Sequence, residues 1–164
     1  MKTIYIVRHA KAGSGSQYTG DFDRRLNEVG LKAAHVLAGL LEERSVAPDL
    51  VITSPATRSL STAEIFCEIL GYPKDSIEKR MEIYEGGAGR LMTIVQQLEE
   101  CNHTIMLFGH NPTVTAFSNL LSGSDLNSMA TCGVVCLDFN SELWSDAHPG
   151  CCKLVWYDYP KQHQ

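Results

Sequence analysis

The chain has 164 residues, of which 44% are hydrophobic and 20% charged, and its formal net charge is −5 at pH 7. This length and balance predict one globular domain over residues 1–164 that buries a sizeable core. The acidic charge argues against nucleic acid as a partner. No apolar run reaches the ~20 residues of a membrane span, and residues 2–7 have the pattern of a core strand, not of a signal peptide. We therefore expect a cytoplasmic protein, with a monomer as the default.

The chain opens with the apolar run 3–7, which predicts a buried strand. Arg8 and His9 follow this run with no spacer. A cation and an imidazole are thus expected at the carboxyl end of a strand, where open α/β sheets bind ligands. The next segment, 12–18, is rich in Gly and Ser and predicts a loop beside this motif.

Two helices and a strand are predicted next. A helix is expected over 27–44, with His35 on its solvent side and core positions at helical spacing: Leu31, Ala34, Leu37, Ala38 and Leu41. The run 50–53 predicts a second strand and leads directly into the segment Ser54-Pro55-Ala56-Thr57-Arg58. The following helix, 57–70, is expected to end at Gly71.

The second half of the chain repeats this alternation. Residues 83–87 predict a short extended piece with a turn, and 90–100 predict a helix. A third strand, 104–108, runs into Gly109-His110, and a helix over 112–121 is expected to have Asn111 as its cap and Pro112 at its first position. Residues 133–139 and 153–159 predict two last strands, for which an antiparallel edge is one open arrangement.

Strands separated by helices imply right-handed crossovers between parallel neighbours. The predicted fold class is therefore α/β: a single-domain three-layer sandwich with a mostly parallel central sheet and helices on both faces.

The six cysteines do not predict a disulfide framework. Without an export signal, reduced thiols are expected, and Cys67, Cys132 and Cys136 suit small buried positions in or beside apolar elements. His148, Cys151 and Cys152 lack the second ligand pair of a zinc site. This segment is better explained as a turn into the last strand, and we expect no metal.

Because parallel strands end at one edge of a sheet, we expect Arg8, His9, Arg58 and His110 to converge there. Two imidazoles and two guanidiniums suit a dianionic phosphoryl group, whose oxygens match the planar fork of arginine. A neutral His9 would be a good nucleophile toward phosphorus, and Arg8 would disfavour its protonated form. The remaining ring N–H needs an acceptor to fix the tautomer, and we predict a backbone carbonyl.

These three motifs resemble those of the histidine phosphatase superfamily. Its Arg-His-Gly signature corresponds to Arg8-His9-Ala10, its Ser-Pro-x-x-Arg-x-x-x-Thr-Ala segment to residues 54–63, and its Gly-His-x-Pro segment to residues 109–112. The short length and several smaller features make the chain most similar to the SixA-like branch: the opening Arg-His-Ala-Lys-Ala, residues 23–26 and 83–85, and the closing Pro160-Lys161. Ala10 in place of glycine is a mark of that branch and matters only if the backbone needs a positive φ.

The resemblance implies a metal-independent, cofactor-free phosphatase that works through a covalent phosphohistidine. His9 would be the nucleophile, and His110 would donate a hydrogen bond to the phosphoryl group that Arg8 and Arg58 clamp. Arg25 resembles an additional phosphate-side arginine, although Arg24 beside it leaves the register open. Glu85 resembles the general acid of larger members, with Glu82 as the fallback, but an exposed loop carboxylate remains an equal interpretation of Glu85.

The predicted connections between helices and strands are short, and none contains an insertion long enough to form a lid over the pocket. An uncapped pocket favours a phosphohistidine presented on another protein, such as a helical phosphotransfer domain. An imidazole leaving group, with a pKa of ~6.5, also needs little help from an acid. Two alternatives remain: a small-molecule phosphomonoesterase that uses Glu85 as its acid, and an inactive module that binds phosphoproteins.

Overall fold

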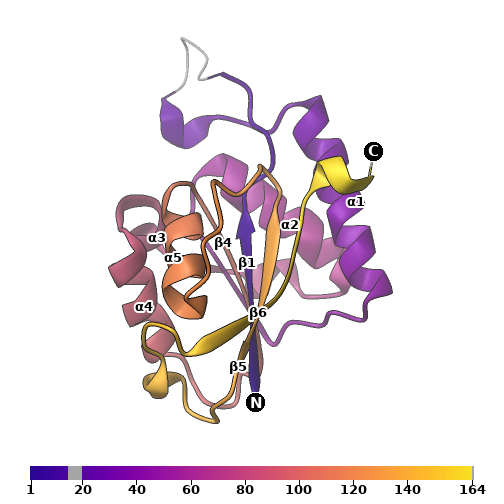
Figure 1. The fold of residues 1–164 in the computed structure, drawn as a ribbon. Coiled ribbons are helices and arrows are strands. Elements are labelled where there is room, and N and C mark those ends of the chain that lie inside the picture. The colour runs from indigo at the N-terminus through magenta and orange to yellow at the C-terminus, as the bar shows by residue number, and fades with distance from the viewer. Residues whose placement is uncertain (15–19, 164) are drawn as a thin grey trace.

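A computed structural model of the chain describes residues 1–14 and 20–163. Within this part, six strands form one sheet in the order β3-β2-β4-β1-β5-β6 (Figure 1). The strands are β1 (Lys2–Arg8), β2 (Leu50–Thr53), β3 (Glu78–Lys79), β4 (Thr104–Gly109), β5 (Val134–Phe139) and β6 (Cys152–Asp158). Of the segment 12–18, predicted to be a loop, residues 15–18 lie outside the described residues.

The sheet is parallel in its centre and antiparallel at one edge. Strands β1, β4, β2 and β3 pair in parallel, whereas β5 runs antiparallel to β1 and β6 antiparallel to β5. The α/β fold with a mostly parallel sheet is thus confirmed, as is an antiparallel arrangement of the last two strands. The two-residue strand β3 was not predicted, because so short a segment carries no periodicity.

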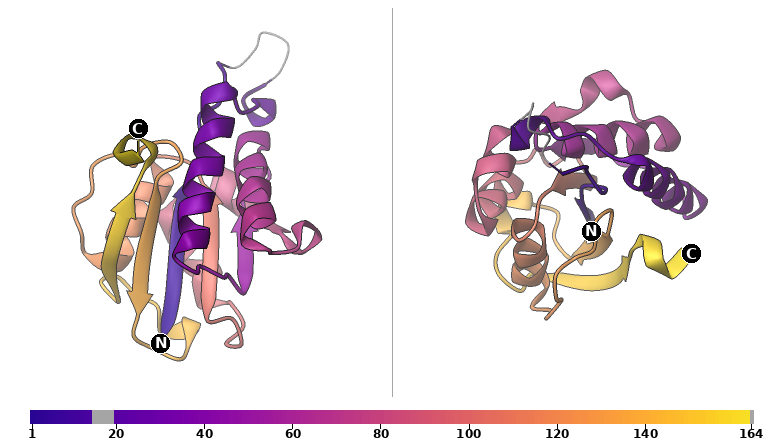
Figure 2. Two further views of the ribbon diagram at one scale, coloured as in Figure 1. Left: turned by 90° about the vertical axis from the view of Figure 1, so that its right-hand side faces the viewer. Right: turned by 90° about the horizontal axis from the view of Figure 1, so that it is seen from above.

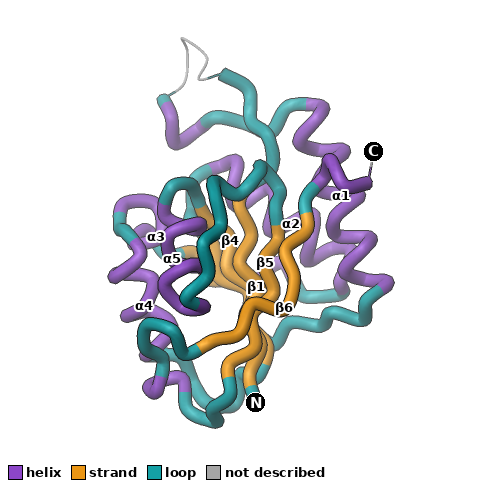
Figure 3. The backbone as a smooth tube through the Cα atoms, in the orientation of Figure 1, coloured by secondary structure: helices purple, strands orange, loops and turns teal. Residues whose placement is uncertain are grey.

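Helices cover both faces of the sheet (Figures 2 and 3). On one face α1 (Glu28–Glu43) and α2 (Thr57–Leu70) pack against side chains such as Val7, Val51 and Phe108. On the other face lie α3 (Met81–Glu85), α4 (Ala88–Gln96) and α5 (Thr113–Ser122), which pack against side chains such as Ile6, Ile52 and Leu107. Neighbouring residues of β1 and β2 thus serve opposite cores, as the pleat of a strand requires.

Local signals in the sequence explain the ends of α1 and α2. The Asn27 side chain accepts a hydrogen bond from the Gly30 N–H at 2.8 Å and so caps α1. Helix α2 has the predicted bounds and ends at Gly71, whose φ of 79° lies in the left-handed region that glycine adopts without strain.

Four local predictions were wrong. Residues 81–85 form α3 and not an extended piece, and the turn closes through the Gly86 N–H on the Glu82 carbonyl at 2.7 Å. Helix α4 covers 88–96 and not 90–100. The Asn111 side chain does not cap α5; its Oδ1 accepts from the Thr115 hydroxyl at 2.7 Å, and Pro112 lies before the first helical residue. Leu31, predicted for the core, is 43% exposed.

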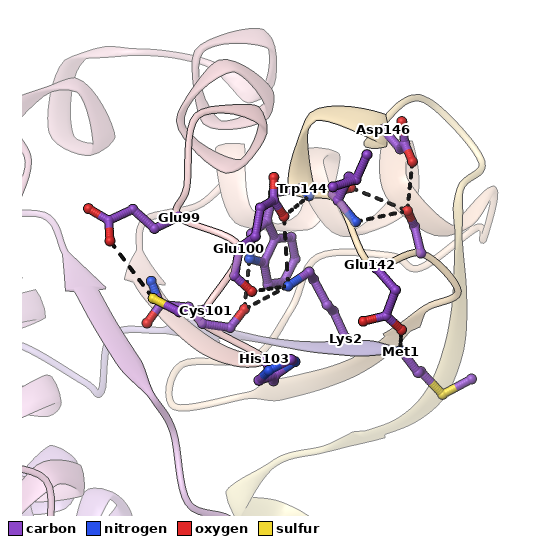
Figure 4. Close-up of polar contacts among 12 residues, drawn as sticks. Met1, Lys2, Glu99, Glu100, Cys101, His103, Glu142, Trp144 and Asp146 are labelled. Atoms are coloured by element: carbon purple, nitrogen blue, oxygen red, sulfur yellow. Dashed lines mark hydrogen bonds and ion pairs between the residues drawn. The ribbon is translucent and has the colours of Figure 1, made fainter.

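The amino end of the sheet contains a buried lysine (Figure 4). The fully buried side chain of Lys2 donates to the backbone carbonyls of Glu100 at 2.8 Å and Asn102 at 3.0 Å. Its Nζ also lies 3.8 Å from Glu100 Oε2 and 4.9 Å from the ring centroid of Trp144. The charge is thus fully partnered, and it fixes the start of β1 to the turn that precedes β4.

Other expectations concern single side chains. All six cysteines are free thiols, with Cys67, Cys132 and Cys136 buried as predicted. His35 is exposed, also as predicted. Over residues 1–14 and 20–163, the helices are all too short or too polar to cross a lipid bilayer.

Candidate active site

The three predicted motifs meet at the carboxyl edge of the parallel strands. The strand register pairs Arg8 of β1 with Gly109 of β4, and Thr53 of β2 with Phe108 of β4. Strands β1, β4 and β2 therefore end at the same level of the sheet. The His9 N–H then donates to the Gly109 carbonyl at 3.0 Å. As a result, the ring centroids of His9 and His110 lie only 5.2 Å apart, with the planes inclined by 52°.

His9 is buried, and its Nδ1 lies 2.7 Å from the carbonyl oxygen of Ala10. A carbonyl only accepts, so Nδ1 carries the proton and Nε2 keeps its lone pair. This is the backbone-carbonyl partner that the sequence predicted. Burial, followed by the charges of Arg58, Arg8 and Arg24, lowers the His9 pKa to about 4. The imidazole is therefore neutral and nucleophilic at pH 7.

His110 is also held neutral. Burial, followed by His9 and Arg58, lowers its pKa to about 3. Its Nε2 lies 2.8 Å from the hydroxyl of Ser54, which itself accepts the Ala56 N–H at 3.2 Å. The Ser54 hydroxyl can therefore donate to Nε2 while it accepts the Ala56 N–H, and in that tautomer the proton of the neutral ring is on Nδ1. This gives His110 a hydrogen-bond donor without a positive charge.

The two arginines of the motifs each use part of their donor capacity. Arg8 Nη1 donates to the Met129 carbonyl at 2.8 Å. Arg58 donates from Nη1 to the Asp21 carbonyl at 2.7 Å and from Nη2 to the Asp21 carboxylate at 3.0 Å. Three buried side-chain nitrogens in the described part of the chain have no partner, and all three belong to this cluster: Nε of Arg8, Nε of Arg58 and Nδ1 of His110.

Thr62 connects two of the motifs. Its hydroxyl donates to the Arg58 carbonyl at 2.8 Å and accepts the Ala10 N–H at 3.0 Å. In the described residues, positive φ angles outside glycine occur at Ser45 and Cys132. Ala10 therefore adopts an ordinary backbone conformation, and its methyl group in place of glycine introduces no strain.

Asp21 is a member of the cluster that the sequence did not indicate. It begins a short 3₁₀ turn (Asp21–Asp23), and its carboxylate also accepts from the Tyr84 hydroxyl at 2.8 Å and from Arg24 Nη1 at 3.1 Å. These hydrogen bonds, that of Tyr84 first, and the Arg58 charge lower the Asp21 pKa to about 2. Tyr84 in turn packs edge-on against the His110 ring, with 5.5 Å between the centroids.

Of the two neighbouring arginines, Arg24 has contacts with the cluster in the described residues. Arg24 donates to the Gly13 carbonyl at 3.0 Å and to Asp21, and its charge contributes to the low pKa of His9. Arg25, the residue chosen from the sequence, is exposed. The backbone at Arg24 is extended, so the two neighbouring side chains point in different directions.

In the described residues, neither candidate acid has a hydrogen bond or ion pair with the cluster. Glu85 is exposed at the end of α3. Glu82 Oε2 lies 3.4 Å from Arg80 Nη2, and its pKa is lowered by a backbone hydrogen bond and by the Arg80 charge. Within the same helix, Tyr84 contacts the cluster through Asp21 and the His110 ring. In the described residues, no three His, Cys, Asp or Glu side chains are arranged to hold a metal ion.

Comparisons with known proteins agree with this geometry. The family described as the histidine phosphatase superfamily (branch 1) matches residues 4–89, more than half of the chain. An uncharacterised protein of Mycobacterium tuberculosis is 27% identical over 94% of this chain and 100% of its own length.

Two solved structures are similar over nearly the whole chain. A candidate phosphohistidine phosphatase SixA from Agrobacterium tumefaciens is 28% identical, with a TM-score of 0.82 over 97% of this chain and 98% of that chain. The protein histidine phosphatase SixA in complex with tungstate has a TM-score of 0.85 over 99% of both chains. Its sequence is 22% identical to this chain, so this similarity is evidence for the shared fold alone.

Proposed function

The chain belongs to the histidine phosphatase superfamily and is a phosphatase of that family, and we propose that it removes the phosphoryl group from phosphohistidine on a phosphotransfer protein. The reaction would pass through a covalent phosphohistidine on His9 and need no metal ion. We further propose that it acts in the cytoplasm, in signal transduction, and that Arg8, Arg58, His110 and Arg24 surround the phosphoryl group.

One observation carries this proposal. The three unpartnered buried nitrogens belong to Arg8, Arg58 and His110 and are grouped around a neutral nucleophile; both guanidinium nitrogens are donors, and the imidazole nitrogen is one in the tautomer in which Ser54 donates to His110. A buried donor without an acceptor costs about 1–3 kcal/mol, and protein structures contain few of them. A phosphoryl group offers acceptor oxygens only, so it would satisfy these donors while its charge is balanced by the guanidiniums.

The proposed reaction has two steps. His9 Nε2 attacks phosphorus, an N–P bond forms to His9, and the N–P bond to the substrate imidazole breaks, with the electron pair leaving on that imidazole. The departing imidazole takes a proton from solvent. Water then attacks the phosphorus on His9, releases inorganic phosphate and restores the neutral ring. The Ala10 carbonyl holds the His9 tautomer throughout.

The carboxylates near the site favour an easily protonated leaving group. Asp21 has a pKa of about 2, and the pKa of Glu82 is lowered, so both are ionised near neutrality and are weak general acids. An alkoxide leaving group needs an effective general acid, but an imidazole leaving group with a pKa of ~6.5 does not. This argues for phosphohistidine over an alkyl phosphate.

A substrate panel tests the proposal. Free phosphohistidine, a histidine-phosphorylated helical phosphotransfer domain, an aryl phosphate and an alkyl phosphate would be assayed with a chelator present. We expect both phosphohistidine substrates to have a kcat/KM at least ~100-fold above that of the alkyl phosphate, the usual worth of a positioned general acid. Preference for the alkyl phosphate would support the small-molecule alternative, and activity lost with the chelator would contradict the metal-free mechanism.

A further inference from the structure

A second concave region lies beside the cluster, between α1 and the C-terminal turn Pro160–His163. This pocket has a volume of about 530 Å³ and is lined by apolar side chains, including Val29, Val36 and Ala130, with Lys11, Lys32 and Lys161 around them. Figure 1 shows the C-terminal segment beside α1, at the end of the sheet where the parallel strands terminate.

The apolar part of this surface is not used by the core. Val29 and Val36 are 59% and 42% exposed, and their spacing of seven residues places them two turns apart on one side of α1. Both valines border the concavity, so a partner seated in it would remove their apolar area from water. A partner that covers them would recover this hydrophobic energy.

The charged part has a sign opposite to that of the whole molecule. The chain carries a net charge of −5, yet three lysines surround this pocket. Ion pairs in the described residues involve other side chains and leave Lys11, Lys32 and Lys161 without a carboxylate partner. Local positive charge of this kind selects an acidic surface and steers its approach.

The pocket is joined to the reacting histidine by short stretches of backbone. Lys11 lies two residues after His9. On the opposite side, Thr131 precedes Cys132, whose N–H donates to the His9 carbonyl at 3.0 Å. Ala130, also in the lining, follows Met129, whose carbonyl holds Arg8. A macromolecule seated in the pocket would therefore lie directly beside the phosphoryl clamp.

We propose that this surface, formed by Val29, Val36, Lys11, Lys32 and Lys161, docks the phosphoprotein substrate. The inference rests on the proposed function. The matching element is an amphipathic helix whose apolar stripe covers the two valines and whose flanking Asp or Glu side chains pair with the lysines. Docking there raises the effective concentration of the phosphohistidine at His9, so it favours protein substrates over free phosphohistidine.

The test uses the double variant Lys32→Glu/Lys161→Glu in the full chain. Its matched control is Lys79→Glu/Lys153→Glu, which makes the same charge change at two exposed lysines outside the pocket. The probes are an acidic helical phosphotransfer domain, with and without phosphate on its histidine, and free phosphohistidine. We expect the pocket variant to raise KM for the phosphorylated domain by about tenfold or more with kcat unchanged. Turnover of free phosphohistidine should not change, and the control should behave as wild type.

Binding of the unphosphorylated domain separates the two proposals. Calorimetry should detect this binding with wild type and the control, and a loss of about tenfold or more in affinity with the pocket variant. Equal affinity for all three proteins, or no binding to wild type, would overturn the docking surface even if phosphohistidine is hydrolysed. Normal docking without hydrolysis of either phosphohistidine substrate would instead overturn the proposed function.

Discussion

At the scale of single residues, the proposed chemistry depends on two imidazoles that stay neutral among cations. The sequence indicated the effect of Arg8 on His9, but burial is the larger cause of the lowered pKa at both rings. Burial was not predictable from the motif alone, because it depends on segments such as residues 129–132 that fold over the strand ends. Neutrality is thus a property of the assembled site.

This neutrality predicts how stability changes with pH. The His9 pKa is about 4 when folded and ~6.5 when unfolded, so below pH 6.5 the unfolded chain binds the extra proton first. Stability is therefore lost as the pH falls from about 6.5 to about 4, by about 3 kcal/mol for His9. The check is urea unfolding across this range, in which His9→Asn should make the profile less steep but not flat, because the lowered pKa of His110 acts in the same direction. NMR titration of the His9 ring near pH 6.5 would contradict the account.

The contact between Asp21 and Arg58 gives a second prediction. Asp21 occupies two nitrogens of the guanidinium that the proposal assigns to phosphate, so an oxyanion competes with the Asp21 side chain. Asp21→Asn should remove this competing charge and tighten tungstate binding by about threefold to tenfold. Asp23→Asn is the control, since Asp23 is an exposed carboxylate of the same turn. Unchanged or weaker tungstate affinity in Asp21→Asn, measured by calorimetry, would show that the contact does not oppose the anion.

At the scale of elements, long periodic segments were predictable and short ones were not. Helix α2 has its predicted bounds because its ends carry local signals, a Ser-Pro segment before it and Gly71 after it. Helix α3 and strand β3 contain five and two residues, so their conformation is decided by what they pack against. The Glu85 prediction rested on a resemblance to the family's segment, and the contacts of Tyr84 within the same helix were not indicated by it.

Contacts between distant elements left no sign in the sequence. Asp21 and Arg58 are 37 residues apart in the sequence. Neither the sequence of the 3₁₀ turn nor that around Arg58 contains a pattern that predicts this contact. The choice between Arg24 and Arg25 was likewise open until the extended backbone at Arg24 was known. Convergence of the motifs was predictable from parallel strands, but the side chains that complete the cluster were not.

Strand β1 permits a prediction in which a substitution changes stability and leaves catalysis unchanged. Lys2 lies at the amino end of this strand and Arg8 at its carboxyl end, so the two ends can be tested separately. Lys2→Met keeps an apolar stem but leaves the partly buried Glu100 carbonyl without its donor, while the Asn102 carbonyl still accepts from the Trp144 indole N–H at 2.8 Å. We expect the free energy of unfolding to fall by about 1–3 kcal/mol, with kcat of the folded protein unchanged.

Urea unfolding and steady-state kinetics on the same preparation check this prediction. Lys153→Met, at an exposed position of β6, is the control and should change the free energy of unfolding little. Equal stability of Lys2→Met and wild type would mean that the buried charge contributes nothing, and a lower kcat would show that the two ends of β1 are coupled.

At the scale of the whole molecule, the fold places several positively charged side chains at one end of a protein whose net charge is negative. Arg8, Arg24 and Arg58 act on His9, and the lysines of the proposed docking surface lie beside them, while the net charge remains −5. The positive field is thus local to one end of the fold, where the proposed substrate would bind. Composition alone excluded a general affinity for anions, but only the three-dimensional arrangement shows where the positive charge is concentrated.

The central claim is that His9 carries the phosphoryl group during turnover, and rapid quenching tests it most directly. Wild-type protein would be mixed with ³²P-labelled phosphohistidine substrate, quenched in alkali within milliseconds, and mapped by peptide analysis. The account predicts acid-labile, alkali-stable label on His9, and loss of both label and turnover in His9→Ala. Label on another residue, or near-normal turnover by His9→Ala, would contradict it.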